Sequence, residues 1–149
     1  MARCCEAGVD GIILPDLPYE EKGEFADVAK QYGVDLISMI APTSEDRIAM
    51  IAKEASGFIY IVSSLGVTGE RSEITTNIGD LVKLVRNNTD VPCAVGFGIS
   101  KPEQAKAMAA LSDGAIVGSA IIKLIEKHGK DAAKYVGEYV KEMKNAVIS

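Results

Sequence analysis

The feature that most constrains the fold of this sequence is a regular alternation of short apolar runs with amphipathic stretches. Most connections between a run and the next helical stretch are only a few residues long. A buried strand followed closely by an amphipathic helix is a βα unit, and repeated units require a parallel sheet with helical crossovers. The predicted strands cover residues 11–14, 34–40, 58–62, 93–95 and 115–117.

The stretches between these runs carry helical periodicity and helix-end signals. Gly33 follows one of them at the position where a helix C-terminal glycine is common. Ser100 precedes Pro102 and Glu103, which predicts a helix that begins with a serine cap. The predicted helices cover residues 20–32, 43–55, 78–87, 120–126 and 131–147, and a further helix starts at residue 100.

The composition restricts the class of protein. Apolar residues make up 48% and charged residues 25% of the 149 residues, the balance of a one-domain globular chain, which excludes disorder and collagen-like repeats. The net charge of −5 leaves no excess of Lys and Arg to bind a nucleic-acid backbone. No apolar run reaches the roughly 18–20 residues of a membrane span, and no leader pattern opens the chain. The three cysteines, two of them adjacent, are more typical of reduced thiols, so we expect a cytoplasmic protein without membrane association.

Two architectures fit five βα units: an open doubly wound sheet and part of a (β/α)8 barrel. In both, ligands bind at the carboxyl ends of the strands. Glycines follow three of the runs there, in residues 66–69, 96–98 and 118–119. The last two, with the short helix that follows, match the phosphate site of barrels after strands 7 and 8, and neither a dinucleotide-binding nor a Walker motif occurs. We therefore expect residues 1–149 to form a single partial TIM-barrel domain of five parallel strands alternating with helices.

Four segments carry a resemblance to a known family. They are GVDGIILPDLPYEE at 8–21, SLGVTG at 64–69, GFGIS at 96–100 and VGSA at 117–120. At these motifs the sequence resembles the tryptophan synthase alpha chain, over nearly its whole length. The resemblance implies a lyase of tryptophan biosynthesis that cleaves indole-3-glycerol phosphate to indole and glyceraldehyde 3-phosphate. It also implies a beta chain as partner, which holds the pyridoxal phosphate, and no cofactor or metal in the alpha chain itself.

The resemblance extends from the family's fourth strand to its C-terminus, with residues 1–6 resembling the end of the preceding helix. The family's two catalytic carboxylates, a Glu on strand 2 and an Asp in the loop after it, lie in the half that is not matched. The cleavage needs one group to protonate the indole ring and another to accept the glycerol hydroxyl proton. The resemblance therefore implies no catalytic residue in this chain and no activity of the chain alone.

The resemblance also assigns binding residues. It places the substrate phosphate in glycine-rich loops and the indole in a largely apolar pocket, with a threonine on a loop that closes over the site. The phosphate-binding residues are Gly69, Gly98, Gly118 and Ser119. The substrate-pocket residues are Asp16, Met39, Tyr60, Thr68, Phe97 and Ile116. In the family, the segments near Asp16, Pro42 and Thr68 also take part in communication with the beta chain.

Five strands of an eight-stranded barrel leave two open sheet edges and one uncovered sheet face. We expect either a homo-oligomer in which sheets of different copies pair or pack, or an N-terminal segment that covers the face. The apolar residues expected to supply this exposed surface are Ile12, Leu14, Ile37, Ile59, Ile61, Val95 and Ile116.

Two other interpretations fit part of the pattern. One is a non-catalytic partial barrel that binds phosphorylated ligands and oligomerises. The other is a complete small α/β protein of another barrel-related or flavodoxin-like family. The Asp-Gly strand entries at residues 10–11 and 113–114, combined with the GVTG loop at 66–69, disfavour the second.

Overall fold

The strands form one parallel sheet whose spatial order follows the order in the chain. The computed structural model describes residues 1–63, 71–96 and 98–149, with residues 71–77 described by their backbone alone. The sheet order is β1-β2-β3-β4-β5, and every neighbouring pair is parallel. A doubly wound sheet reverses its order at a switch point, whereas a barrel adds strands in sequence, so the barrel prediction is confirmed. The strands are β1 (Gly11–Ile13), β2 (Asp35–Ile40), β3 (Ile59–Val62), β4 (Cys93–Gly96) and β5 (Gly114–Ile116).

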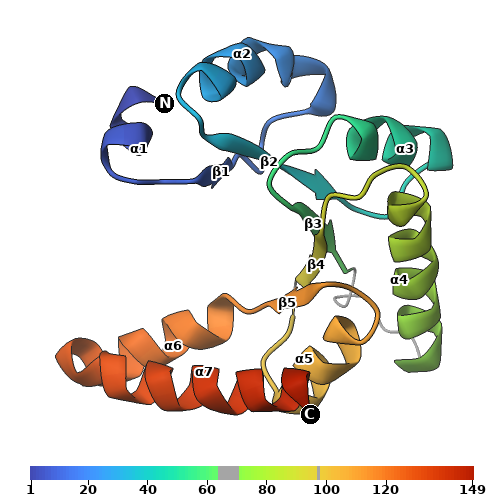
Figure 1. The fold of residues 1–149 in the computed structure, drawn as a ribbon. Helices are drawn as coiled ribbons and strands as arrows, with labels where there is room; N and C mark the ends of the chain where they lie inside the picture. Colours follow the sequence, from blue (N-terminus) through green and yellow to red (C-terminus); the bar gives the residue numbers. More distant parts are fainter. Residues whose placement is uncertain (64–70, 97) are drawn as a thin grey trace.

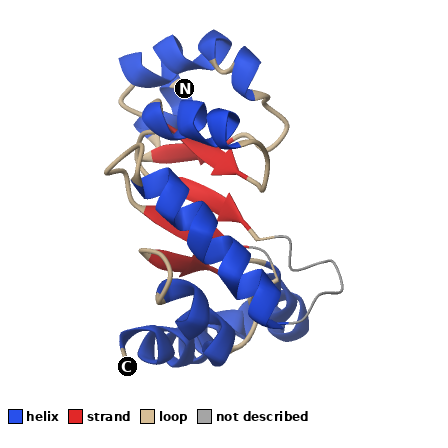
Figure 2. Cartoon of the chain, turned by 90° about the vertical axis from the view of Figure 1, so that its right-hand side faces the viewer, coloured by secondary structure: helices blue, strands red, loops and turns tan. Residues whose placement is uncertain are grey.

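The larger helices lie along one side of this sheet. Figure 1 shows α2, α3, α4 and α5 following the sheet around its outer side, with α6 and α7 as a helical pair beside β5. In Figure 2 the helical side faces the viewer, and the strands lie behind the helices. The helices are α1 (Ala2–Glu6), η1 (Tyr19–Glu21), α2 (Gly23–Gln31), α3 (Glu45–Lys53), α4 (Arg71–Arg86), α5 (Pro102–Ala109), α6 (Ser119–His128), η2 (Gly129–Asp131) and α7 (Ala132–Ile148).

The main core lies between the sheet and its helices. Alternate residues of a strand point to opposite faces. Ile59 and Ile61 are fully buried in a cluster with side chains of α3, α4, α5 and α7, whereas Tyr60, which lies between them, is only half-buried. The face that carries Tyr60 is therefore the less covered one in the part of the chain that the structure describes.

The prediction of which apolar residues lie on the less covered face was wrong for part of the set. Ile59, Ile61 and Val95 belong to the helix-facing core. Ile37 is also buried, because Gly11 and Gly57 have no side chain and the Ile37 side chain packs close to both. The half-buried members of the set are Ile12, Leu14 and Ile116.

The glycine at the end of α2 forms the predicted helix terminus. Gly33 has φ +64°, and its N–H donates to the carbonyl of Lys30 at 3.2 Å. The N–H of Val34 donates to the carbonyl of Ala29 at 3.0 Å. This pair of bonds is the Schellman arrangement, which satisfies carbonyls at the helix end and turns the chain into β2.

The starts of α2, α4 and α5 differ from the prediction, and at α2 the helix expected from residue 20 is divided into η1 and α2. Helix α4 begins at Arg71, before the predicted residue 78. The apolar pattern did not predict its first two turns, because they are largely polar and carry no apolar periodicity. At α5 the predicted serine cap was wrong. The Gln104 side chain instead accepts hydrogen bonds from the N–H groups of Ser100 and Lys101, both at 3.0 Å, and so satisfies the helix start from within the first turn.

A carboxylate joins the two last strands at their amino ends. The Cys93 N–H donates to Oδ2 of Asp113 at 2.9 Å, and the Asp113 N–H donates to the Cys93 carbonyl at 2.9 Å. The Arg86 guanidinium donates to Oδ1 of Asp113 at 3.1 Å. The bond from the Cys93 N–H, together with Arg86, holds the pKa of the Asp113 carboxyl below its usual range.

Replacing this carboxylate is expected to destabilise the fold in a pH-dependent way. Asp113→Ala leaves the buried Cys93 N–H without that acceptor, which costs about 1–3 kcal/mol at pH 7. Since folding lowers the pKa, the carboxylate's contribution is present at neutral pH and is lost as the pH falls through the native pKa. Denaturant unfolding at pH 7 and pH 3 measures the effect, with Asp80→Ala on exposed α4 as the matched control. Equal losses of stability for Asp113→Ala at both pH values contradict the assignment.

Candidate functional site

The predicted phosphate residues of the last two units lie at matching positions. Gly96 of β4 pairs with Ile116 of β5, and Gly98 and Gly118 each follow two residues later. Because parallel strands end at the same edge of a sheet, both glycines lie beyond the carboxyl ends of neighbouring strands. Both residues are exposed, and Gly98 has φ +76°, a conformation that favours glycine.

Helix α6 begins at this edge. Gly118 is its N-cap, and the Gly118 carbonyl accepts from the N–H groups of Ile121 and Ile122 at 2.9 and 3.2 Å. Ser119, the first residue of the helix, is exposed. The first N–H groups of a helix have no partner within it and carry partial positive charge, so this end can accept an anion.

An aromatic ring lies next to this edge on the less covered face. A Cβ atom on Gly96 would lie 2.6 Å from Cζ and 2.7 Å from Cε1 of Tyr60, so the ring occupies the space that any side chain at Gly96 would need. The buried Ser63 hydroxyl donates to the Gly96 carbonyl at 2.9 Å and so links the ends of β3 and β4. Tyr60, Gly96 and the half-buried Ile116 thus form one apolar surface beside the glycines.

The other pocket predictions lie toward β1 and β2. Met39 is half-buried and pairs with Tyr60 across β2 and β3. Asp16 is exposed, in a turn closed by the Leu17 N–H donating to the Leu14 carbonyl at 3.1 Å. Thr68, Gly69 and Phe97 lie outside the described residues.

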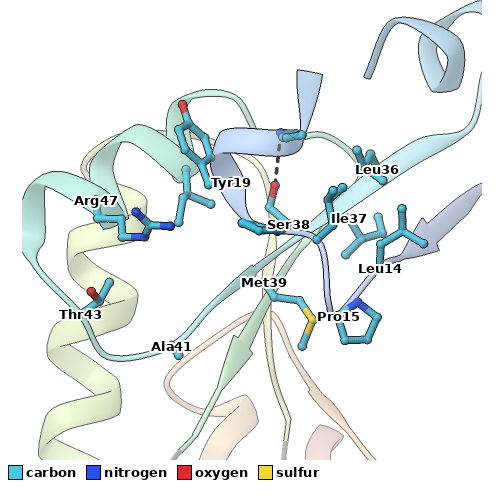
Figure 3. Close-up of a pocket in the computed structure, with 14 residues that line it drawn as sticks. Leu14, Pro15, Tyr19, Leu36, Ile37, Ser38, Met39, Ala41, Thr43 and Arg47 are labelled. Atoms are coloured by element: carbon cyan, nitrogen blue, oxygen red, sulfur yellow. Dashed lines mark hydrogen bonds between the residues drawn. The ribbon is translucent and has the colours of Figure 1, made fainter. Parts of the chain in front are cut away.

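A cavity of about 270 Å³ opens at the carboxyl ends of β1 and β2 (Figure 3). Met39 lines it together with the segment after β1 and the start of α3, while Asp16 is not among its lining residues. Arg47 at its rim pairs with Glu20 through two hydrogen bonds of 2.6 and 3.0 Å. The Lys22 ammonium donates to the Ser38 hydroxyl at 3.4 Å and to the Glu54 carbonyl at 2.9 Å.

These bonds give both cations of the cavity, Lys22 and Arg47, acceptors within the chain. The hydrogen bonds from Arg47 lower the pKa of Glu20, and a hydrogen bond to Glu54 raises the pKa of the Tyr19 hydroxyl. Because the cations already have acceptors within the chain, the cavity is better described as a structural contact between the segment after β1 and α3 than as a binding site for an anion.

Two further searches cover only the described residues. In residues 1–63, 71–96 and 98–149, no three His, Cys, Asp or Glu side chains lie together in a way that could hold a metal ion. Within the same residues, none of the helices combines the length and apolar character needed to cross a bilayer.

Comparison with known sequences decides the family. Residues 1–148 match the family described as tryptophan synthase alpha chain. This chain belongs to the tryptophan synthase alpha chain family. It is 47% identical to the alpha chain of Lacticaseibacillus casei over 147 residues, which are 99% of this chain and 55% of that relative. It is 49% identical to the alpha chain of Lactiplantibacillus plantarum over 146 residues, which are 97% of this chain and 55% of that relative.

Solved alpha chains have the same fold as the described part of this chain. The subunit from Campylobacter jejuni superposes with a TM-score of 0.87 at 31% identity, over 95% of this chain and 56% of that one. A chain from a tryptophan synthase a2b2 complex of Pyrococcus furiosus superposes with a TM-score of 0.82 at 34% identity, over 97% of this chain and 59% of that one. The chain therefore spans about half the length of the tryptophan synthase alpha chains it matches, as a partial (β/α)8 barrel.

Two residues at the edge were not singled out from the sequence. Gly96 belongs to the glycine segment and the GFGIS motif of the sequence analysis but has no role there, and the structure shows it within β4, against the Tyr60 ring. Ser63 carried no signal of its own beyond being a hydroxyl directly after an apolar run. Both matter because they bring β3 and β4 together at the end where the glycines lie.

Proposed function

We propose that this chain supplies the C-terminal five βα units of a tryptophan synthase alpha chain, with residues 1–149 as one partial barrel domain. The observation that carries this is the pairing of Gly96 with Ile116, which puts Gly98 and the start of α6 at neighbouring strand ends. Barrels bind phosphate after strands 7 and 8 and at the N-terminus of a short extra helix. The same arrangement follows β4 and β5 here, which favours their correspondence to the last two strands.

The proposed ligand is indole-3-glycerol phosphate. Gly98, Gly118 and Ser119, with Gly69, which lies outside the described residues, hold its phosphate through backbone N–H groups and one hydroxyl. The aromatic and aliphatic surface of Tyr60, Ile116 and Met39, with Phe97 and Thr68, receives the indole. Asp16 lies at the rim of this pocket.

The proposed reaction is the aldol cleavage that releases indole and glyceraldehyde 3-phosphate, carried out by a whole alpha chain. In this proposal both catalytic carboxylates come from outside this chain, which contributes substrate binding alone. In this proposal the protein acts in the cytoplasm beside a beta chain, which holds the pyridoxal phosphate, and the alpha chain needs no cofactor of its own. The likeness to alpha chains solved within a2b2 complexes supports this partner.

Phosphate binding tests the assignment directly. Glycerol phosphate added to the folded chain is expected to shift the amide signals of Gly98, Gly118 and Ser119. Ser119→Ala should weaken binding by roughly 2- to 12-fold, because one hydroxyl hydrogen bond contributes about 0.5–1.5 kcal/mol. Ser44→Ala, which removes a hydroxyl at the start of α3, is the matched control and should leave the affinity unchanged.

The alternative function is a phosphate-ligand-binding module without any role in the cleavage. This alternative predicts the same amide shifts on addition of glycerol phosphate. It predicts no indole release when a polypeptide with the remaining part of a barrel is added. Amide shifts that cluster away from α6 in the folded protein contradict both versions.

A further inference from the structure

One side chain of α7 bonds to the backbone of the segment that follows Gly98. The Tyr139 hydroxyl donates to the Ser100 carbonyl at 2.9 Å, although the two residues are 39 positions apart in the chain. The Tyr139 ring is half-buried and packs against the main core, so its position is set by more than this one bond. Helix α7 is thereby tied to residues 98–101, which lead from β4 into α5.

The Tyr139 hydroxyl keeps the proton that this bond needs. Burial raises the pKa of the hydroxyl, and the negative charge of Glu142, three residues further along α7, adds to the effect. A neutral hydroxyl donates to a carbonyl, whereas a phenolate can only accept. The bond to Ser100 is therefore present at neutral pH.

Other contacts hold the same short segment. The N–H groups of Ser100 and Lys101 donate to the Gln104 side chain, both at 3.0 Å. Ile99 is buried and belongs to the main core. With the bond from α7, the residues directly after Gly98 are held by the core, by α5 and by α7, while Gly98 itself is exposed.

The same tyrosine lies near the start of α6. A cavity of about 350 Å³ is lined by Tyr139 together with Val117 and Ile121, which stand on either side of Gly118 and Ser119 in the chain. Helix α7 contacts both α5 and α6, and Figure 1 shows it running beside them. Tyr139 is therefore next to both segments to which the proposed function assigns the phosphate.

We propose that Tyr139 is a positioning residue for the substrate phosphate: its bond to Ser100 holds residues 98–101 in place relative to the start of α6, so that both segments can bind one phosphate group. This inference rests on the proposed function, since it concerns the same site. The two segments belong to separate βα units, so their spacing depends on the helices that pack beside them. Binding groups that the fold already holds in place lose less conformational freedom when a ligand binds, so the hydroxyl strengthens binding without contacting the phosphate.

Tyr139→Phe tests this role, because it removes the hydroxyl and keeps the ring that packs on the core. Glycerol phosphate is added to the folded variant, and the amide signals of Gly98, Gly118 and Ser119 report binding. The affinity should fall by roughly 2- to 5-fold, because one hydrogen bond changes an equilibrium by at most about tenfold and only part of this effect reaches the ligand.

Tyr135→Phe is the matched control. It removes a hydroxyl one turn earlier on α7, from a ring that stacks on His128 with 3.6 Å between the ring centroids, and it should bind glycerol phosphate like the parent. Only folded molecules give the signals that are followed, so a variant that is merely less stable keeps the parent's affinity. Without ligand, Tyr139→Phe should also shift the amide signals of Gly98 and Ser100, and Tyr135→Phe should leave them unchanged.

The outcomes separate this inference from the proposed function. If the parent binds glycerol phosphate at these residues and Tyr139→Phe binds it equally tightly, the inference is overturned and the proposed function stands. Equal weakening by Tyr139→Phe and Tyr135→Phe also overturns the inference, since the effect then belongs to α7 as a whole. If glycerol phosphate shifts none of these signals in the parent, the proposed function is overturned and the inference falls with it.

Discussion

Indole-3-glycerol phosphate should remain uncleaved by this chain alone and should be cleaved once a polypeptide with the first three βα units of a family alpha chain is added. A positioned acid or base contributes typically 10²–10⁴ in rate, so the absence of both groups removes roughly 10⁴–10⁸. The described carboxylates are poor replacements. Asp16, the one predicted at the rim of the pocket, is exposed in a turn, and an exposed side chain of this kind does not hold a proton donor within the tolerance of catalysis.

The measurement is indole release by the chain, by the added polypeptide and by their mixture, each with and without a beta chain. Activity in the mixture should disappear when the carboxylates of the added polypeptide are replaced by their amides. Activity of this chain alone that is lost in Asp16→Asn contradicts the proposal, since it places the reaction in these five units. Ser119→Ala in the mixture should weaken substrate binding without abolishing cleavage.

Gly96→Ala should both destabilise the fold and displace the Tyr60 ring. The added Cβ would lie 2.6 and 2.7 Å from two ring carbons, closer than real atoms approach, so either the strand or the ring must move. Forcing extra volume into a packed site costs about 1–3 kcal/mol, and because the half-buried Tyr60 ring can move, the loss should lie toward the lower end of that range. Because the ring lies beside the proposed indole surface, ligand binding should fall along with stability.

Gly114→Ala is the matched control for this change. A Cβ at Gly114 would meet only the Ala94 Cβ, at 3.7 Å, which is ordinary contact, and neither glycine has a positive φ. Denaturant unfolding and near-ultraviolet signals of the tyrosines distinguish the two variants. If Gly96→Ala is as stable as Gly114→Ala and leaves the tyrosine environment unchanged, the close contact between Tyr60 and Gly96 does not exist in solution.

The sequence alone determined which segments became strands and helices, because these depend on local properties. The run at 34–40 became β2 at Asp35–Ile40, and the run at 58–62 became β3 at Ile59–Val62. Gly33 ended its helix as predicted. The left-handed backbone conformation after a helix depends on the residue at that one position, and glycine adopts it readily. The motifs at the strand ends also sufficed to indicate the family, since they are short and contiguous.

Local properties did not predict helix starts correctly where more than one side chain could accept hydrogen bonds from the first N–H groups. Ser100 and Gln104 both offer an acceptor at the start of α5, and the glutamine takes the role because its side chain reaches back to two N–H groups. The polar first turns of α4 likewise lack an apolar stripe, so a helix there depends on continuation from the apolar turns that follow.

Only the tertiary structure decided which face of each strand is covered and which residues meet. Alternation along β3 separates Ile59 and Ile61 from Tyr60, but a period of two does not say which set the helices cover. The contact of Tyr60 with Gly96, and the pairing that sets Gly98 beside the start of α6, join residues more than 15 positions apart. Strand order and register determine such contacts, and these result from packing of the whole sheet against its helices, which no short stretch of sequence contains.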